Sequence, residues 1–174
     1  MLTRIRRFWR ACSGATGEEL ALIAPVFILM MLVTVELGYM IFTYSVLDGA
    51  ARTAARLVRT GQAQAKADPL GTFTAAVCTN VNGVIPCGSI ATDVESFGTF
   101  SGMTPAAVTT DKSGNVTNSA WVPGGPNAAV DVRVFYTYHF MVPFVSQLLN
   151  PGGTGVLLTS TVVFKNEPYP VAGP

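Results

Sequence analysis

One long apolar stretch near the N-terminus dominates the hydrophobic pattern of this chain. It runs from Leu20 to Tyr44, and Glu36 is its only carboxylate. A helix needs about 20 apolar residues to cross the hydrocarbon core of a bilayer, so this stretch predicts a transmembrane helix. The apolar region of a cleaved secretory signal is shorter, about 7–15 residues, so we expect the helix to remain in the mature protein.

Helical periodicity continues past this apolar stretch. Small and apolar residues recur on one face from residue 50 to residue 58, and the opposite face carries Arg52, Arg56 and Arg59. We therefore expect a single helix, over residues 15–60, that leaves the membrane as a rod. The arginine face is interpreted as solvated, with a subunit contact or a lipid-headgroup contact as the alternatives.

The remainder of the chain has the pattern of short strands and turns. Residues 61–174 are rich in Gly, Pro, Ser, Thr and Asn, with short apolar runs such as Phe73–Cys78. Residues 130–140 alternate between valine or aromatic residues on one face and mostly polar residues on the other, which predicts a strand. Residues 156–165 predict a second strand rich in β-branched residues, and residues 142–149 predict one or two helical turns.

These patterns predict an α+β fold, in which a small antiparallel sheet lies against the outer half of the long helix. The expected organisation is a basic leader over residues 1–14, the transmembrane and extended helix over 15–60, and a small β-rich extramembrane domain over 61–174. The core of such a domain is small, so a covalent link and the helix are expected to help hold it together.

Composition favours a membrane protein and argues against nucleic-acid binding. Charged residues make up 12% of the chain, against about 25% in an average soluble domain. The formal net charge is +1, and no stripe of basic and aromatic residues is visible beyond the N-terminal region.

The cysteines divide by position. Cys12 precedes the apolar stretch, whereas Cys78 and Cys87 follow it with eight residues between them. A close pair in a segment rich in Gly, Ser, Thr and Asn predicts a disulfide in an oxidising compartment, with a reduced, buried thiol pair as the alternative. Zinc requires about four ligands, and neither the cysteine spacing nor the single histidine supplies them, so no metal site is predicted.

The leader is basic and free of acids, which favours a cytoplasmic N-terminus. Four arginines precede the apolar stretch, but four basic residues also follow it closely. The orientation therefore rests as well on the predicted disulfide, which places the C-terminal part outside the cytoplasm.

A short motif lies at the start of the apolar stretch. Gly14 is followed by four residues and then by Glu19, directly before continuous apolar sequence. This spacing resembles the processing site of type IV prepilins and pseudopilins. The resemblance implies that a prepilin peptidase cuts between Gly14 and Ala15, and that Glu19 becomes the fifth residue of the mature chain. As an alternative, the acids simply favour the N-terminal end of a helix.

Glu36 is the second acid of the predicted span. It lies seventeen residues after Glu19, about 26 Å along a helix. The two acids are then either at opposite edges of the hydrocarbon core, or Glu36 is buried and requires a partner, which favours an assembly of helices.

Two further segments resemble the TadE-like proteins of the tight-adherence (Flp-type) pilus system. The first is GATGEELALIAPVFILMMLVTVELGYMIFTYSVLDGAARTAAR, and the second is the closing FKNEPYP of residues 164–170. The resemblance implies a pilin-like protein of the bacterial inner membrane with a periplasmic C-terminal domain, which in one alternative is incorporated into an extracellular pilus. The implied partners are the lipid bilayer, other pilins or pseudopilins, the prepilin peptidase and the pilus assembly machinery.

No catalytic constellation is visible, so the chain is not expected to be an enzyme or to need a cofactor. His139 lies on the predicted strand and is interpreted as a surface or half-buried residue. Five acids beyond the helix show no organising spacing: Asp93, Glu95, Asp111, Asp131 and Glu167. The function expected is therefore structural, in pilus assembly, with an unprocessed membrane-anchored periplasmic binding or envelope protein as the alternative.

Overall fold

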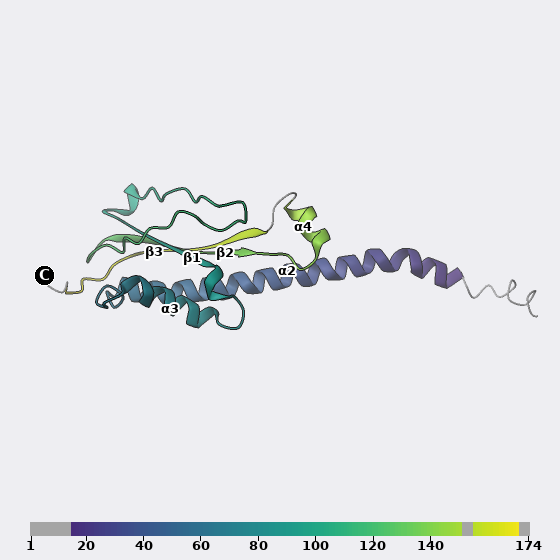
Figure 1. The fold of residues 1–174 in the computed structure, drawn as a ribbon, viewed down its shortest axis with the longest axis horizontal. Coiled ribbons are helices and arrows are strands. Elements are labelled where there is room, and N and C mark those ends of the chain that lie inside the picture. Colours follow the sequence, from purple (N-terminus) through teal and green to yellow (C-terminus); the bar gives the residue numbers. More distant parts are fainter. Residues whose placement is uncertain (1–14, 151–154, 171–174) are drawn as a thin grey trace, which may run out of the picture. The chain divides into compact units, whose positions relative to one another are not determined.

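The computed structural model describes residues 15–150 and 155–170, and it confirms the predicted α+β class. The chain divides into two compact units, one ending at Gly38 and the other beginning at Tyr39. The helices and strands are, in order, α2 (Ala15–Arg59), α3 (Pro69–Val81), β1 (Ile90–Phe97), β2 (Ala129–Tyr138), α4 (Pro143–Leu149) and β3 (Val156–Lys165). Two single 3-10 turns, η2 (Cys87–Ser89) and η3 (Phe100–Gly102), flank β1 (Figure 1).

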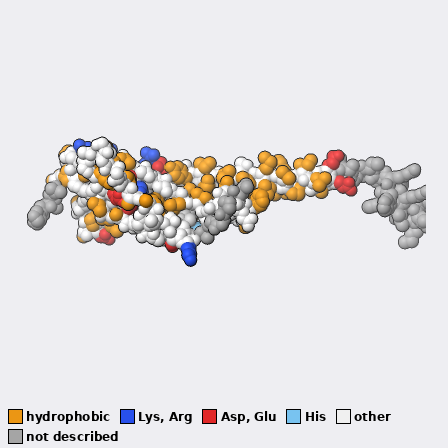
Figure 2. Space-filling model, turned by 90° about the horizontal axis from the view of Figure 1, so that it is seen from above, with side chains coloured by type: hydrophobic (Ala, Val, Ile, Leu, Met, Phe, Trp, Pro, Cys, Tyr) orange, Lys and Arg blue, Asp and Glu red, His pale blue; other side chains and the backbone are white. Residues whose placement is uncertain are grey.

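The N-terminal part of α2 exposes its large apolar side chains. Leu22 is 78% exposed, and Ile23 and Met30 are each 64% exposed. Hydrophobic side chains cover this part of the helix in Figure 2. Burying such surface is the main favourable term in folding, so a helix that leaves it uncovered in the folded chain requires another apolar environment. The helix is long and apolar enough to cross a membrane.

The C-terminal part of α2 buries the small-residue face that the sequence predicts. Ala51, Ala54 and Val58 are fully buried, and they belong to the same hydrophobic cluster as valines of the sheet. Small side chains allow close approach of the helix to the sheet. Ser160 of β3 is fully buried and donates a hydrogen bond of 2.8 Å to Asp48 Oδ1 of α2, which ties the two elements together. The arginine face is exposed, as expected.

The sheet has three antiparallel strands in the order β1-β2-β3. The register aligns Phe97 with Ala129 at one end of the sheet, and Tyr138 with Val156 at the other. The predicted strands are confirmed as β2 and β3, and the predicted helical turns as α4. The inward face of β2 carries the alternating residues Val130, Val132 and Val134, which are fully buried.

The expectation of strands around Phe73–Cys78 is wrong, because this segment lies in helix α3. Asp68 caps its N-terminus, since its Oδ1 accepts a hydrogen bond of 2.9 Å from the Gly71 amide, and Pro69 opens the first turn. Phe73, Val77 and Val81 recur every four residues and are fully buried in the hydrophobic cluster. Helical spacing of the apolar residues, rather than the small and polar composition, decides the conformation here.

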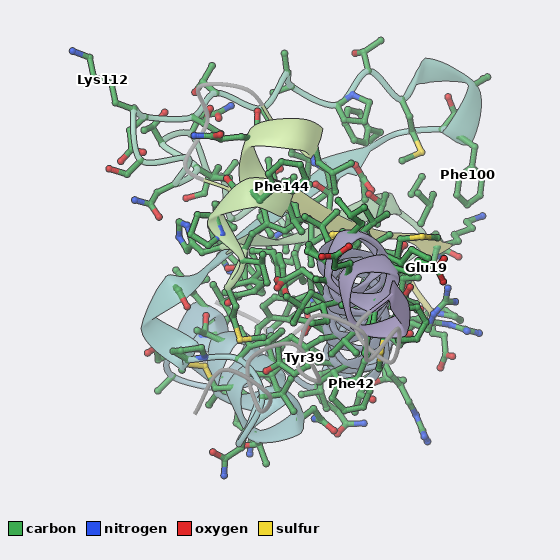
Figure 3. The ribbon with its side chains drawn as sticks, turned by 90° about the vertical axis from the view of Figure 1, so that its right-hand side faces the viewer. Glu19, Tyr39, Phe42, Phe100, Lys112 and Phe144 are labelled. Atoms are coloured by element: carbon green, nitrogen blue, oxygen red, sulfur yellow. A yellow bond between two sulfur atoms is a disulfide. The ribbon has the colours of Figure 1, made fainter. Side chains whose placement is uncertain are left out.

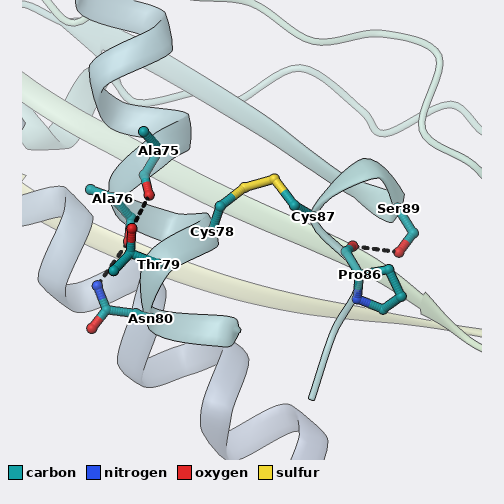
Figure 4. Close-up of a disulfide and its surroundings, with 8 residues drawn as sticks. All are labelled: Ala75, Ala76, Cys78, Thr79, Asn80, Pro86, Cys87 and Ser89. Carbon is teal, nitrogen blue, oxygen red and sulfur yellow. Dashed lines mark hydrogen bonds between the residues drawn. A yellow bond between two sulfur atoms is a disulfide. The ribbon is translucent and has the colours of Figure 1, made fainter. Parts of the chain in front are cut away.

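Cys78 of α3 and Cys87 of η2 form the predicted disulfide (Figure 4). Their Cα atoms are 5.2 Å apart, a usual separation for such a bridge. The bond closes the turn that connects α3 to β1. A loop of this length is expected to contribute about 2–3 kcal/mol to stability through the entropy of the unfolded chain.

Candidate functional site

The acids at the start of α2 form the first candidate site. Gly14, the glycine of the predicted processing motif, lies outside the described residues, whereas Ala15 is the first residue of α2. Glu18 and Glu19 are exposed in the first turns, where carboxylates interact favourably with the helix dipole. Figure 2 shows acidic side chains at this end of the described helix, directly before the apolar surface.

The spacing of Ala15 and Glu19 has a chemical consequence for a processed chain. Residues four apart lie on one face of a helix, about 6 Å along the axis from each other. A new ammonium group on Ala15 would therefore lie close to the carboxylate of its own Glu19, or would bind the Glu19 of a neighbouring chain. Either pairing lowers the cost of holding a carboxylate beside hydrocarbon.

Glu36 lies in a different environment from Glu19. Only 2% of Glu36 is exposed, whereas Glu19 is exposed. A buried carboxylate is costly unless it is hydrogen-bonded or paired, so this position constrains the side chains packed around it.

The closing segment after β3 is bound to the C-terminal end of α2. The Glu167 amide donates a hydrogen bond of 2.9 Å to the Arg59 carbonyl, and the two side chains form an ion pair of 3.2 Å. Asn166 donates to the carbonyls of Pro123 and Gly125, each at 3.0 Å. The segment that resembles the family ending thus fixes the position of the helix relative to the last strand.

Gly61 allows the closing segment to pack this closely against the residues that follow α2. Its φ is +74°, and a Cβ built on it would lie 2.5 Å from Cγ of Tyr169. The ring of Tyr169 therefore occupies the space that any other residue would fill. The Tyr169 hydroxyl accepts a hydrogen bond of 3.2 Å from Gln64, five residues after the end of α2.

A second site that the sequence did not reveal lies on the outer face of the sheet. Arg133 of β2 contacts three carboxylates: Asp93 at 2.5 Å, Glu95 at 3.1 Å and Asp131 at 3.5 Å. The strand register brings these four side chains together, because Asp93 aligns with Arg133 and Glu95 aligns with Asp131. We refer to these four residues as the Arg133 cluster.

The connection between β1 and β2, residues 98–128, encloses the Arg133 cluster. Arg133 Nη1 donates a hydrogen bond of 2.7 Å to the Ala106 carbonyl, and the Ala106 amide donates one of 3.2 Å to Glu95. The Ala120 amide donates a hydrogen bond of 2.6 Å to Asp93. The side chains of Arg133 and Asp93 are only 10% and 5% exposed. The cluster thus attaches an irregular segment to the sheet through charge-assisted hydrogen bonds.

Asp131 is the least satisfied member of the cluster. It is 2% exposed, and its Oδ1 is buried with no hydrogen-bond partner. Burial raises the pKa of Asp131 above its ordinary 3.8; the charge of Arg133 opposes the rise, and the charges of Asp93 and Glu95 add to it. Three carboxylates around one guanidinium leave an excess of negative charge, and this excess disfavours the ionised form of Asp131.

Asp131→Asn is expected to become increasingly favourable as the pH rises. In the parent, the folded protein binds the Asp131 proton more tightly than the unfolded chain, because the pKa is raised on folding. The stabilisation that comes from proton binding is complete below the pKa of Asp131 in the unfolded chain, and it is lost as the pH rises through the pKa in the folded protein. The asparagine variant has no such loss. Urea unfolding of parent and variant at several pH values between 4 and 7 measures the difference in unfolding free energy. A difference in unfolding free energy that is constant with pH would contradict the assignment.

The remaining predicted residues are not brought together. Asp111 and Glu167 lie outside the Arg133 cluster, and His139 is exposed just after the end of β2 rather than on the strand. Over residues 15–150 and 155–170, no group of three or more His, Cys, Asp and Glu side chains has the arrangement to hold a metal ion. The i, i+2 spacing of Asp93 with Glu95 and of Asp131 with Arg133 was the available signal for the cluster.

The family model described as TadE-like protein matches residues 15–56. No curated protein and no solved structure matches the chain. The matched residues cover Glu19, the apolar stretch with Glu36, and most of the small-residue face that packs on the sheet. The match indicates a protein associated with the Tad (Flp-type) pilus. Over residues 15–56, the N-terminal helix of this chain is therefore similar to that of TadE-like proteins.

Proposed function

We propose that this protein is a minor pilin or pseudopilin that acts structurally in the assembly of a Tad (Flp-type) pilus. One observation carries the proposal: an exposed apolar helix opens with Glu19 and coincides with the TadE-like match over residues 15–56. Subunit contacts, rather than chemistry on a substrate, are its mode of action. The apolar side chains that face lipid before assembly face other helices afterwards.

The proposed sequence of events begins in the inner membrane. The basic leader holds the N-terminus on the cytoplasmic side, and the disulfide-containing unit lies in the periplasm. Prepilin peptidase removes residues 1–14, and the resulting ammonium group of Ala15 pairs with Glu19 of an adjacent subunit. A carboxylate in hydrocarbon has no water to replace such a partner, so the pairing selects one register between helices.

The unit that begins at Tyr39, which we call the outer unit, supports this role by holding the C-terminal end of α2 firmly. The small-residue face of the helix packs on the sheet, and the segment around Glu167 fastens the final turn. A force on the helix is therefore transmitted to the sheet without unfolding the connection. The buried Arg133 cluster in turn fixes the long connection over the outer face of the sheet.

Glu19→Ala is expected to permit processing but to reduce assembly strongly, because the neighbouring ammonium group loses its partner. Glu18→Ala is the matched control: it removes an adjacent carboxylate that is also exposed. Both variants are expressed in cells that lack the native copy. Surface pili are counted by electron microscopy, and protein levels and N-termini are checked by immunoblot and mass spectrometry.

Normal piliation with Glu19→Ala would contradict the pairing step. Normal piliation in cells lacking the protein altogether would contradict the proposed role in assembly. If the wild-type chain also keeps its Met1 start beside an active peptidase, the protein acts instead as an unprocessed membrane-anchored envelope protein.

A further inference from the structure

Helix α4 exposes large apolar side chains that the fold of the outer unit does not use. Phe144 is 50% exposed and Leu149 is 48% exposed, while Val145 between them is fully buried. Met141, just before the helix, is 66% exposed. The surrounding sequence contains no Asp, Glu, Lys or Arg from residue 134 to residue 164. Such a surface is apolar and carries no charge to keep it in water.

Both ends of α4 are held at one end of the sheet. Before the helix, the ring of Tyr138 at the end of β2 lies 5.5 Å from that of Phe140. After it, Asn150 Nδ2 donates a hydrogen bond of 2.5 Å to the carbonyl of Gly155, which precedes β3. Figure 1 shows α4 at this end of the sheet. The helix is therefore a fixed part of the outer unit.

This end of the sheet lies beside Tyr39 of α2. The rings of Tyr138 and Tyr39 are 6.2 Å apart. Tyr39 comes nineteen residues after Leu20, about 28 Å along a helix, which is close to the thickness of a hydrocarbon core, about 30 Å. If Leu20 lies at the inner boundary, Tyr39 lies at the outer one.

Aromatic residues mark the same level on α2. Tyr39, Phe42 and Tyr44 are 40%, 52% and 42% exposed, and Figure 3 shows the first two projecting from the helix. Tyrosine is enriched where a span meets the headgroups, because its ring is apolar and its hydroxyl is polar. The next charged residue along the helix is Asp48, which is also the first after Glu36.

We propose that α4 rests in the outer interfacial layer of the bilayer and, with the aromatic residues of α2, forms a second membrane contact. The inference rests on the proposed membrane span. It commits to lipid rather than to a second copy, because the uncharged surface lies at the end of the sheet that packs on Tyr39, beside the exposed aromatic residues of α2. Two contacts at different places fix the tilt of the outer unit relative to the membrane plane, which a single span leaves free.

The test uses the full-length chain in phosphatidylcholine and phosphatidylglycerol vesicles, with Cys12→Ser as the background. Single cysteines at Phe144→Cys, Phe100→Cys and Leu32→Cys carry an environment-sensitive fluorophore. Phe100 is the matched control, because it is 53% exposed but follows the end of β1 aligned with Ala129. That end lies about 30 Å along the sheet from Tyr138. Leu32, in the apolar stretch of α2, reports the span itself.

We expect quenching by lipid-attached nitroxide to be several-fold stronger at position 144 than at position 100, with the reverse order for soluble iodide. Equal behaviour at these two positions, with position 32 quenched by lipid, overturns the inference and leaves the span intact. No lipid quenching at position 32 overturns the proposed span and this inference with it. Shielding at position 144 that disappears as protein is diluted with lipid also overturns it, because a second copy would then be the occupant.

Discussion

Replacing Gly14 with leucine is expected to leave the chain uncut, with Met1 as the N-terminus. Glycine has no side chain, so it permits close approach of a protease to the backbone on both sides of the bond. Leucine fills that space. In cells with active prepilin peptidase, the parent chain should begin at Ala15 and the variant should retain all fourteen leader residues.

Gly17→Leu is the matched control for this substitution. A Cβ built on Gly17 meets no atom within 4 Å, so the larger side chain is accommodated there, and cleavage at Ala15 should persist. Mass spectrometry of the membrane fraction distinguishes the products. An Ala15 start in Gly14→Leu, or an intact parent chain beside an active peptidase, would contradict the processing step.

Loss of the leader also changes the electrostatics of the chain. The leader contains four of the eleven basic residues and none of the ten acids, so the formal charge changes from +1 to −3. In the proposed orientation, the removed arginines would meet anionic lipid on the cytoplasmic side, where each would contribute about 1 kcal/mol of attraction. An uncut Gly14→Leu chain should therefore remain in the membrane and fail to support pili.

Arg133→Met is expected to destabilise the outer unit by about 3–5 kcal/mol, since the substitution leaves buried carboxylates without their counter-ion. Arg133 is 10% exposed at the side chain, and Asp93 and Asp131 are 5% and 2% exposed. The Ala106 carbonyl also loses its donor. Methionine preserves most of the apolar stem, so the effect reports the charge and the hydrogen bonds rather than the volume.

Arg52→Met tests an ion pair of the same chemistry at the surface. Arg52 Nε lies 2.7 Å from Asp48, but its side chain is 66% exposed, so water screens the pair and the expected cost is much smaller than that of Arg133→Met. Urea unfolding of the full-length protein in detergent measures both variants, with Trp9→Phe as the background so that the emission comes from Trp121. Trp121 packs against Phe73 with ring centroids 5.4 Å apart, so it reports the core. Equal decreases in the free energy of unfolding of the two variants would contradict the stabilising role of the Arg133 cluster.

The sequence predicted those elements whose periodicity reflects burial on one side. The alternation around Val132 predicted β2, and the small residues on one face of α2 predicted its packing. The helix α3 was missed because its small and polar residues resemble a loop in composition. Its apolar residues nevertheless recur at helical spacing, and Asp68 followed by Pro69 is a sequence signal for the start of a helix.

The candidate sites divide in a similar way. The processing motif and the acids of α2 depend on order along the chain, so the sequence alone predicts them. The Arg133 cluster depends on residues forty positions apart, Asp93 and Arg133, which meet only because β1 and β2 pair in one register. Strand register is set by the packing of a whole face, which a local pattern does not contain.

By itself, the sequence determined that the chain has a membrane-length helix, a likeness to pilin processing sites and one disulfide. These properties follow from consecutive or closely spaced residues. Only the tertiary structure decided that Arg133 is enclosed by carboxylates, that Tyr169 fills the space above Gly61, and that Tyr138 at the end of β2 packs against Tyr39. Each of these contacts joins distant segments, and such contacts exist only after the sheet has formed, when burial of its valines has offset the entropy of closing the long connections.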